Sequence, residues 1–135
     1  MNKETNIERL RLDIEDRLEH LNGGIKGYTA KMSEVAESGE HGKLMYQLSW
    51  SETLFEEVAI AGLLSHILKC FDNEKATIKA IVEQVDGMVH GAVLESFNTG
   101  TLDSSNFARR TQARAWDKTW NDSFDGLRKR LINCQ

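Results

Sequence analysis

Hydrophobic residues recur at intervals of three and four along most of this chain, which is the spacing of amphipathic helices. The first such segment covers residues 7–21, and Thr5 and Glu8 before it have the pattern of a capping box at a helix start. The pair Gly23-Gly24 follows at once, and glycine commonly terminates a helix. The pattern therefore predicts one helix that ends at this pair and a second, shorter helix over residues 25–37.

The central segment, residues 51–71, is the most apolar part of the chain. When its residues are placed at about 100° intervals, apolar side chains cover most of the circumference, which is typical of a helix buried on most sides. The exceptions are Gly62, Ser65, His66 and Lys69, which share one arc. The pattern predicts a buried central helix with a single polar window.

Three further segments have the helical spacing. They are residues 43–48, residues 74–97 and a C-terminal segment that begins near Asp103. Within the second of these, Gly87 and Gly91 are four residues apart, and such glycines usually permit close helix packing. The apolar stripe of the C-terminal segment consists of Trp116, Trp120, Phe124, Leu127 and Leu131. We expect this stripe to face the core from one helix.

These segments together define the expected fold class. No segment alternates hydrophobic and polar residues over a useful length, so no strand is expected. Proline, which is common in interdomain linkers, is absent, and 135 residues is near the usual size of one domain. The prediction is an all-α, single-domain antiparallel helical bundle of five or six helices over residues 1–135.

Composition narrows the cellular setting. Hydrophobic residues make up 40% of the chain and charged residues 28%, which is the balance of a globular protein. The longest apolar run, residues 58–64, is far shorter than the roughly 20 residues needed to span a bilayer, and residues 1–19 do not resemble a secretory signal. We expect a soluble, cytoplasmic protein without membrane contact. In that compartment Cys70 and Cys134 are expected to be free thiols.

The sequence contains no recognised pattern of a catalytic or metal site. None of its four histidines has the spacing typical of zinc or di-iron ligands. A nucleophile elbow, a phosphate-binding loop and a dinucleotide-binding fingerprint are also absent. We therefore expect a protein that is not an enzyme and that uses no metal or cofactor.

One short segment resembles a known family. Ser65-His66-Ile67-Leu68-Lys69 places a lysine three residues after a helical histidine, and in this it resembles the histidine phosphotransfer domains. The resemblance covers residues 65–69 and implies a phosphate-accepting His66. The chain departs from the family at Cys70, where the family has a glycine that lets the partner domain approach. We retain a structural or surface role for His66 as the main interpretation.

Charge is distributed unevenly along the chain. Residues 101–135 carry seven basic and four acidic side chains, although the whole chain has a net charge of −4. The basic residues are Arg109, Arg110, Arg114, Lys118, Arg128, Lys129 and Arg130. A basic helix can follow a phosphate backbone, so a small nucleic-acid-associated subunit of a ribonucleoprotein complex is the alternative function. The acidic residues among them favour a solvated face of mixed charge.

Protein binding is the leading functional interpretation. Trp50 stands at a predicted helix junction, and aromatic residues are common anchors at protein interfaces. His66 and Lys69 of the polar window are further candidate contact residues. We expect a small regulatory or assembly module whose partner is another protein or a second copy of this chain.

Overall fold

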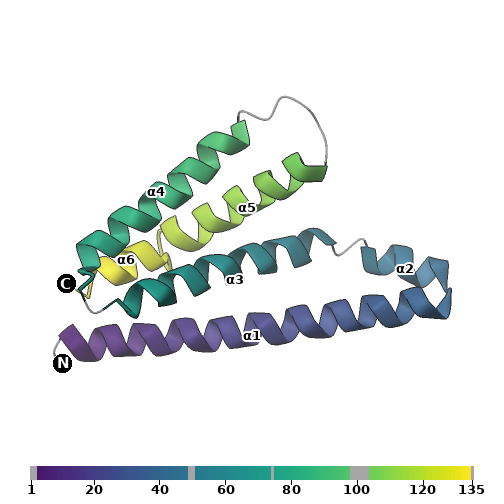
Figure 1. Cartoon of the computed structure of the whole chain (residues 1–135), viewed down its shortest axis with the longest axis horizontal. Helices are drawn as coiled ribbons and strands as arrows, with labels where there is room; N and C mark the ends of the chain where they lie inside the picture. Colours follow the sequence, from purple (N-terminus) through teal and green to yellow (C-terminus); the bar gives the residue numbers. More distant parts are fainter. Residues whose placement is uncertain (1–2, 49–50, 74, 98–103, 135) are drawn as a thin grey trace.

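The computed structural model describes residues 3–48, 51–73, 75–97 and 104–134. These residues form six helices and no strand (Figure 1). The helices are α1 (Lys3–Ser38), α2 (His41–Leu48), α3 (Ser51–Phe71), α4 (Ile78–Phe97), α5 (Ser104–Asn121) and α6 (Leu127–Ile132). They pack against one another, with α1 along α3, α3 along α5 and α4 along α5. The predicted all-α class is confirmed.

The predicted break at Gly23-Gly24 is wrong, because α1 continues from Lys3 to Ser38 without interruption. The only positive φ angle among the described residues is that of Gly39, at 74°, and this glycine ends the helix. A residue with positive φ is the usual terminator of a helix, and the glycines inside α1 do not adopt this conformation. The capping-box expectation at Thr5 is also wrong, since Thr5 already lies within α1.

Helix α3 has the predicted bounds, whereas α4 begins later than expected, at Ile78. The side chain of Asn73 accepts a hydrogen bond from the Lys75 N–H at 3.1 Å and forms a turn before the helix. Thr77 then acts as the N-terminal cap of α4, because its hydroxyl oxygen accepts the Ala80 N–H at 3.1 Å. Local side-chain hydrogen bonds therefore displace the helix start by one turn.

The C-terminal segment is two helices and not one. Helix α5 ends at Asn121, where the Asp122 side chain accepts the Phe124 N–H at 2.9 Å, and α6 begins after Gly126. A Cβ atom at Gly126 would lie only 2.4 Å from the Asp122 backbone oxygen, so the tight turn requires glycine. The break turns Phe124 outward with 88% of its surface exposed, which contradicts the predicted core position of this residue.

The hydrophobic core lies at the end of the molecule that holds both termini. It consists of Leu10, Ile14, Leu63, Leu64, Ile67, Ile81, Val82, Val85, Val89, Trp120, Leu127, Leu131 and Cys134. These side chains come from the first half of α1, the second half of α3, the first half of α4, the end of α5 and α6. Burial of each large apolar side chain contributes roughly 1.5–3 kcal/mol, so this end holds the fold together.

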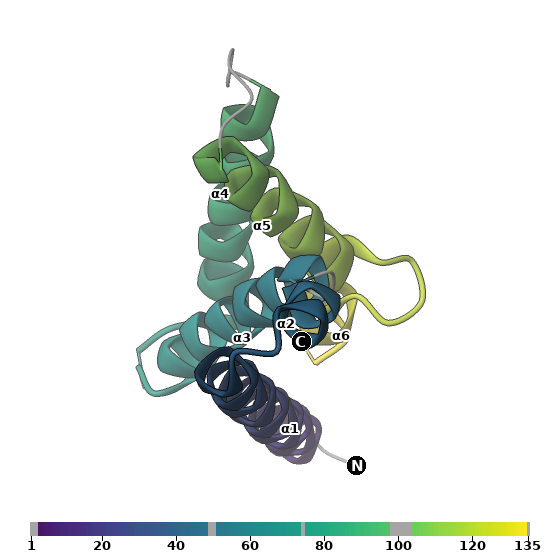
Figure 2. The ribbon, with the colours of Figure 1, turned by 90° about the vertical axis from the view of Figure 1, so that its right-hand side faces the viewer.

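The opposite end is more open. Figure 2 shows that α4 and α5 diverge from α1. The pair α4–α5 and the pair α1–α3 therefore do not form a closed bundle at this end. Helix α3 is buried only in its second half, because Phe55 and Val58 in its first half are 45% and 49% exposed. The prediction of a central helix buried on most sides is therefore correct only for its C-terminal half.

The expectation that Gly87 and Gly91 permit close helix packing is wrong. A Cβ atom added at either glycine would have no neighbour within 4 Å, and both residues are exposed on α4.

No helix in the part of the chain that the structure describes is long and apolar enough to cross a membrane.

Candidate functional site

Large hydrophobic side chains are exposed at the open end of the molecule. They are Met45, Tyr46, Leu48, Phe55, Val58, Leu94, Phe97 and Phe107. These residues lie on α2, the first turns of α3 and α5 and the last turns of α4, away from the two termini (Figure 1). We call this region the open-end surface. These side chains are exposed on four helices at one end of the molecule, and exposed apolar side chains mark candidate interaction sites.

An aromatic pair connects α3 and α5 within the open-end surface. The rings of Phe55 and Phe107 meet edge to face, with centroids 5.9 Å apart and an angle of 73° between their planes. This is a favourable geometry for two aromatic rings. Both side chains keep more than 40% of their surface exposed, at 45% and 43%. The pair therefore holds the two helix ends together and still presents aromatic surface to a partner.

Trp116 also joins α5 to α3, at a position nearer to the hydrophobic core. Its indole N–H donates a hydrogen bond to the backbone carbonyl of Ala59 at 2.7 Å. Arg114 adds an ion pair with Glu52 at 2.9 Å and approaches Glu56 at 3.9 Å. The first half of α3 is thus attached to α5 by polar contacts and has little buried apolar surface.

The structure separates the predicted basic residues into two groups. Arg114, Arg128 and Arg130 pair with acidic residues of other helices, the last with Asp13 at 2.6 Å. Arg109, Arg110, Lys118 and Lys129 are exposed and make no ion pair with any described residue. The seven residues therefore do not form one continuous basic face.

Asp86 of α4 joins three helices at the core end. Its carboxylate accepts the Trp120 indole N–H at 2.7 Å and the Arg128 Nε–H at 2.9 Å. Burial disfavours the carboxylate, but the hydrogen bonds from Arg128 and Trp120 outweigh burial and lower the pKa of Asp86 below its ordinary value. Arg128, expected as a phosphate contact, is thus a structural partner of α4.

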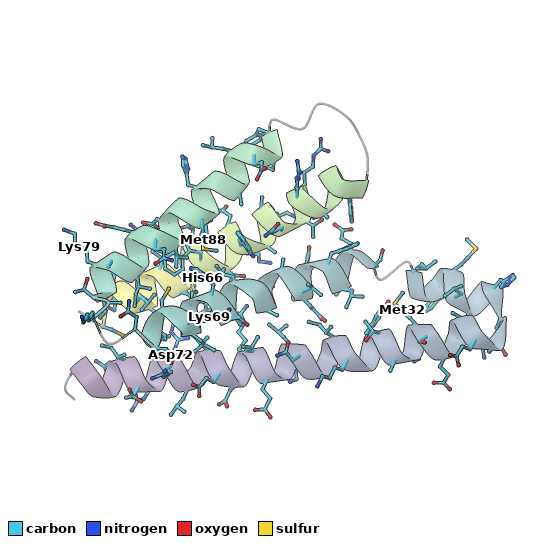
Figure 3. All side chains as sticks on the ribbon, in the orientation of Figure 1. Met32, His66, Lys69, Asp72, Lys79 and Met88 are labelled. Carbon is cyan, nitrogen blue, oxygen red and sulfur yellow. The ribbon has the colours of Figure 1, made fainter. Side chains whose placement is uncertain are left out.

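Within the polar window of α3, His66 contacts α4, whereas Gly62 and Lys69 are exposed. The Nε2 atom of His66 lies 3.2 Å from the amide nitrogen of Gln84, and the Cys70 thiol lies 3.9 Å from the amide oxygen of the same residue. Figure 3 shows His66 on the side of α3 next to α4. His66 is half-buried, Lys69 is exposed, and Trp50 lies outside the described residues. His66 and Lys69 lie three residues apart on α3.

The two cysteines are free thiols. Burial raises the pKa of both thiols, and at Cys134 nearby Arg130 only partly opposes this effect. A raised pKa disfavours the thiolate form of a cysteine. No group of three or more histidine, cysteine or acidic side chains within the described ranges is arranged to hold a metal ion.

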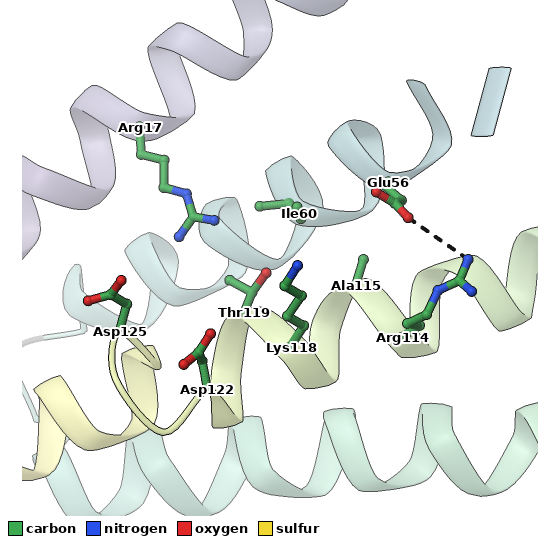
Figure 4. Close-up of a pocket in the computed structure, with 9 residues that line it drawn as sticks. All are labelled: Arg17, Glu56, Ile60, Arg114, Ala115, Lys118, Thr119, Asp122 and Asp125. Atoms are coloured by element: carbon green, nitrogen blue, oxygen red, sulfur yellow. Dashed lines mark ion pairs between the residues drawn. The ribbon is translucent and has the colours of Figure 1, made fainter. Parts of the chain in front are cut away.

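Figure 4 shows a pocket of about 410 Å³. It is formed by α1, α3, α5 and the turn between α5 and α6. Its lining residues are Arg17, Glu56, Ile60, Arg114, Ala115, Lys118, Thr119, Asp122 and Asp125. Three cations and three anions line this pocket, so it carries both signs of charge without a net excess of either.

Comparison with known proteins finds no match: no family model, no curated protein and no solved structure is similar to this chain.

Proposed function

We propose that this chain is a non-catalytic protein-binding module that contacts its partner through the open-end surface. The observation that supports the proposal is the exposure of large apolar side chains at the end that lacks the core, with Phe97 and Met45 exposed by 81% and 73%. Such side chains contribute little to folding when they face water. A partner that covers them recovers the free energy of their burial.

The chemistry of this surface fits protein recognition. Aromatic residues and methionine are enriched in protein interfaces, and aromatic anchors carry much of the binding energy. The Phe55–Phe107 pair supplies a preorganised anchor, because the edge-to-face contact already limits the rotamers of both rings. Less conformational entropy is then lost when a partner binds.

The proposal is tested by affinity purification of the tagged full chain from its native host. Met45→Ser and Phe97→Ser each remove an exposed side chain of the open-end surface, and Phe124→Ser removes an 88% exposed side chain at the other end. We expect the two open-end substitutions to lower recovery of the bound protein about tenfold, as for loss of a contact worth roughly 1.4 kcal/mol, and Phe124→Ser to leave recovery unchanged.

Equal recovery with all three variants, or equal loss, would contradict the proposal. Light scattering after size-exclusion chromatography of the purified chain shows whether the partner is a second copy. A change from oligomer to monomer in Phe97→Ser, without a change in Phe124→Ser, identifies self-association through the open-end surface. Thermal unfolding of each variant confirms that the fold is retained.

Nucleic-acid binding is the second candidate, and it rests on a separate observation. Arg109 and Arg110 are exposed, make no ion pair with a described residue, and lie within three residues of Phe107 on α5. Exposed arginines can contact phosphates, and an exposed aromatic ring can stack on a base. We expect such binding to weaken steeply with salt and to be lost in the double substitution Arg109→Gln and Arg110→Gln. Fluorescence anisotropy with a single-stranded oligonucleotide tests this, and no binding at low salt rejects it.

A further inference from the structure

The pocket shown in Figure 4 contains two cations and two anions that make no ion pair with a described residue. Arg17 of α1 and Lys118 of α5 line it as cations, and neither makes an ion pair with a described residue. Asp122 and Asp125 line it as anions from the turn after α5. Figure 4 shows all four side chains directed toward the same recess.

The third cation and the third anion of the pocket, Arg114 and Glu56, already interact with charged side chains of the protein. Arg114 pairs with Glu52 at 2.9 Å and lies 3.9 Å from Glu56, so this end of the pocket is neutralised within the protein. Asp122 uses one carboxylate oxygen, Oδ1, to accept the Phe124 N–H at 2.9 Å. Two cations and two carboxylates therefore keep hydrogen-bonding capacity for a ligand.

The arrangement discriminates among ligand classes. A simple anion would be attracted by Arg17 and Lys118 but repelled by the two aspartates, and a simple cation would meet the reverse situation. A molecule with separated positive and negative groups satisfies both pairs at once. Ile60 and the buried Ala115 add apolar surface to the pocket. A volume of about 410 Å³ lies within the range of about 300–1,000 Å³ that is usual for small-molecule pockets.

We propose that this pocket binds a small zwitterion of the amino-acid or short-peptide class. Arg17 and Lys118 bind its carboxylate, and Asp122 and Asp125 bind its ammonium group. Its aliphatic part packs against Ile60 and Ala115. This site is separate from the open-end surface, and the proposal does not depend on the proposed protein-binding function.

A set of three matched probes tests the charge requirement. Glycylglycine carries both charges, its N-acetylated form carries only the carboxylate, and its C-terminal amide carries only the ammonium group. We expect saturable changes in the amide NMR signals of residues 114–125 with glycylglycine. Its affinity should exceed that of either blocked form at least about fivefold, which corresponds to the roughly 1 kcal/mol of one charge-assisted hydrogen bond.

Substitutions test whether the probes bind in this pocket. Arg17→Gln should remove the preference for the free carboxylate, and Asp125→Asn should weaken the preference for the free ammonium group. Lys79→Gln and Glu83→Gln make the same charge changes on α4, which contributes no residue to the pocket, and should leave binding unchanged. Absence of saturable binding, equal affinity for the three probes, or equal effects of pocket and control variants would overturn the proposal.

Discussion

At the scale of single residues, Asp86 shows how a partly exposed carboxylate organises the core end. Its acceptor capacity is used by the indole of Trp120, which is completely buried, and by Arg128. We expect Asp86→Ala to lower the free energy of unfolding by about 1–2 kcal/mol, because the Trp120 N–H then has no acceptor in the core. Urea denaturation measures the change. Glu83→Ala, an exposed position on the same helix, serves as the control and should change stability little.

The pKa of Asp86 gives a pH-dependent prediction. Because the hydrogen bonds from Arg128 and Trp120 lower the folded-state pKa of Asp86 below its ordinary value of 3.8, the ionised carboxylate stabilises the fold above that pH. The stabilisation is lost as the pH falls through the folded-state pKa. The difference in unfolding free energy between the natural chain and Asp86→Asn should therefore shrink below about pH 4. A difference that stays constant from pH 7 to pH 3 would show that the charge of Asp86 does not contribute.

Gly126 and Gly91 provide a matched pair of glycine substitutions. A Cβ atom at Gly126 would lie 2.4 Å from the backbone oxygen of Asp122, whereas at Gly91 it would meet nothing within 4 Å. We expect Gly126→Ala to lower the melting temperature by several degrees, because backbone atoms must shift. Gly91→Ala should raise it, since alanine favours the helix by about 1 kcal/mol. A higher melting temperature for Gly126→Ala than for Gly91→Ala would contradict the observed turn.

At the scale of the elements, the length of α1 was predictable from its full hydrophobic pattern. The stripe of residues 7–21 continues in the same register through Ile25, Tyr28, Met32 and Val35. The intervals of three and four are preserved across Gly23-Gly24, so one helix can place both segments on the same face. Glycine lowers helix stability but does not by itself end a helix when the apolar face is continuous.

The glycines of α1 test this explanation. Gly23 has no neighbour within 4 Å of an added Cβ atom and sits inside the helix, whereas Gly39 has a φ of +74° at its end. We expect Gly23→Ala to raise the free energy of unfolding by about 0.5–1 kcal/mol and Gly39→Ala to lower it by about 1 kcal/mol. Thermal unfolding monitored by circular dichroism measures both. A loss of stability in Gly23→Ala would indicate a helix break at that position.

The residue types between α5 and α6 indicate a turn, although the hydrophobic spacing does not. Asn121, Asp122, Ser123 and Gly126 are residues that favour turns, and Asp122 forms the side-chain turn that ends α5. The stripe that includes Phe124 follows the helical spacing through this turn. Periodicity predicted one continuous helix here and placed Phe124 in the core, because it does not register the turn at Asp122 that separates α5 from α6.

At the scale of the whole molecule, the main result is the separation of a packed end from an open end. Hydropathy identified which side chains are apolar, but it did not distinguish Trp120, which is buried, from Phe97, which is 81% exposed. That difference depends on the angle between helix pairs, a long-range property of packing. The sequence predicted a protein interface at Trp50, His66 and Lys69 and did not indicate the side chains of the open-end surface. The sequence identified the basic residues, but it did not indicate that Arg114, Arg128 and Arg130 pair with acidic residues of other helices.

Hydrogen–deuterium exchange of the purified complex tests the central claim most directly. The free chain and the chain bound to its captured protein partner are compared peptide by peptide. We predict that binding slows exchange in α2, in the first turns of α3 and α5 and in the last turns of α4, where the open-end surface lies. The helix ends at the core end, including residues 127–132, should exchange as in the free chain. Slowed exchange confined to the core end, with none in α2, α3 or α5, would contradict the account.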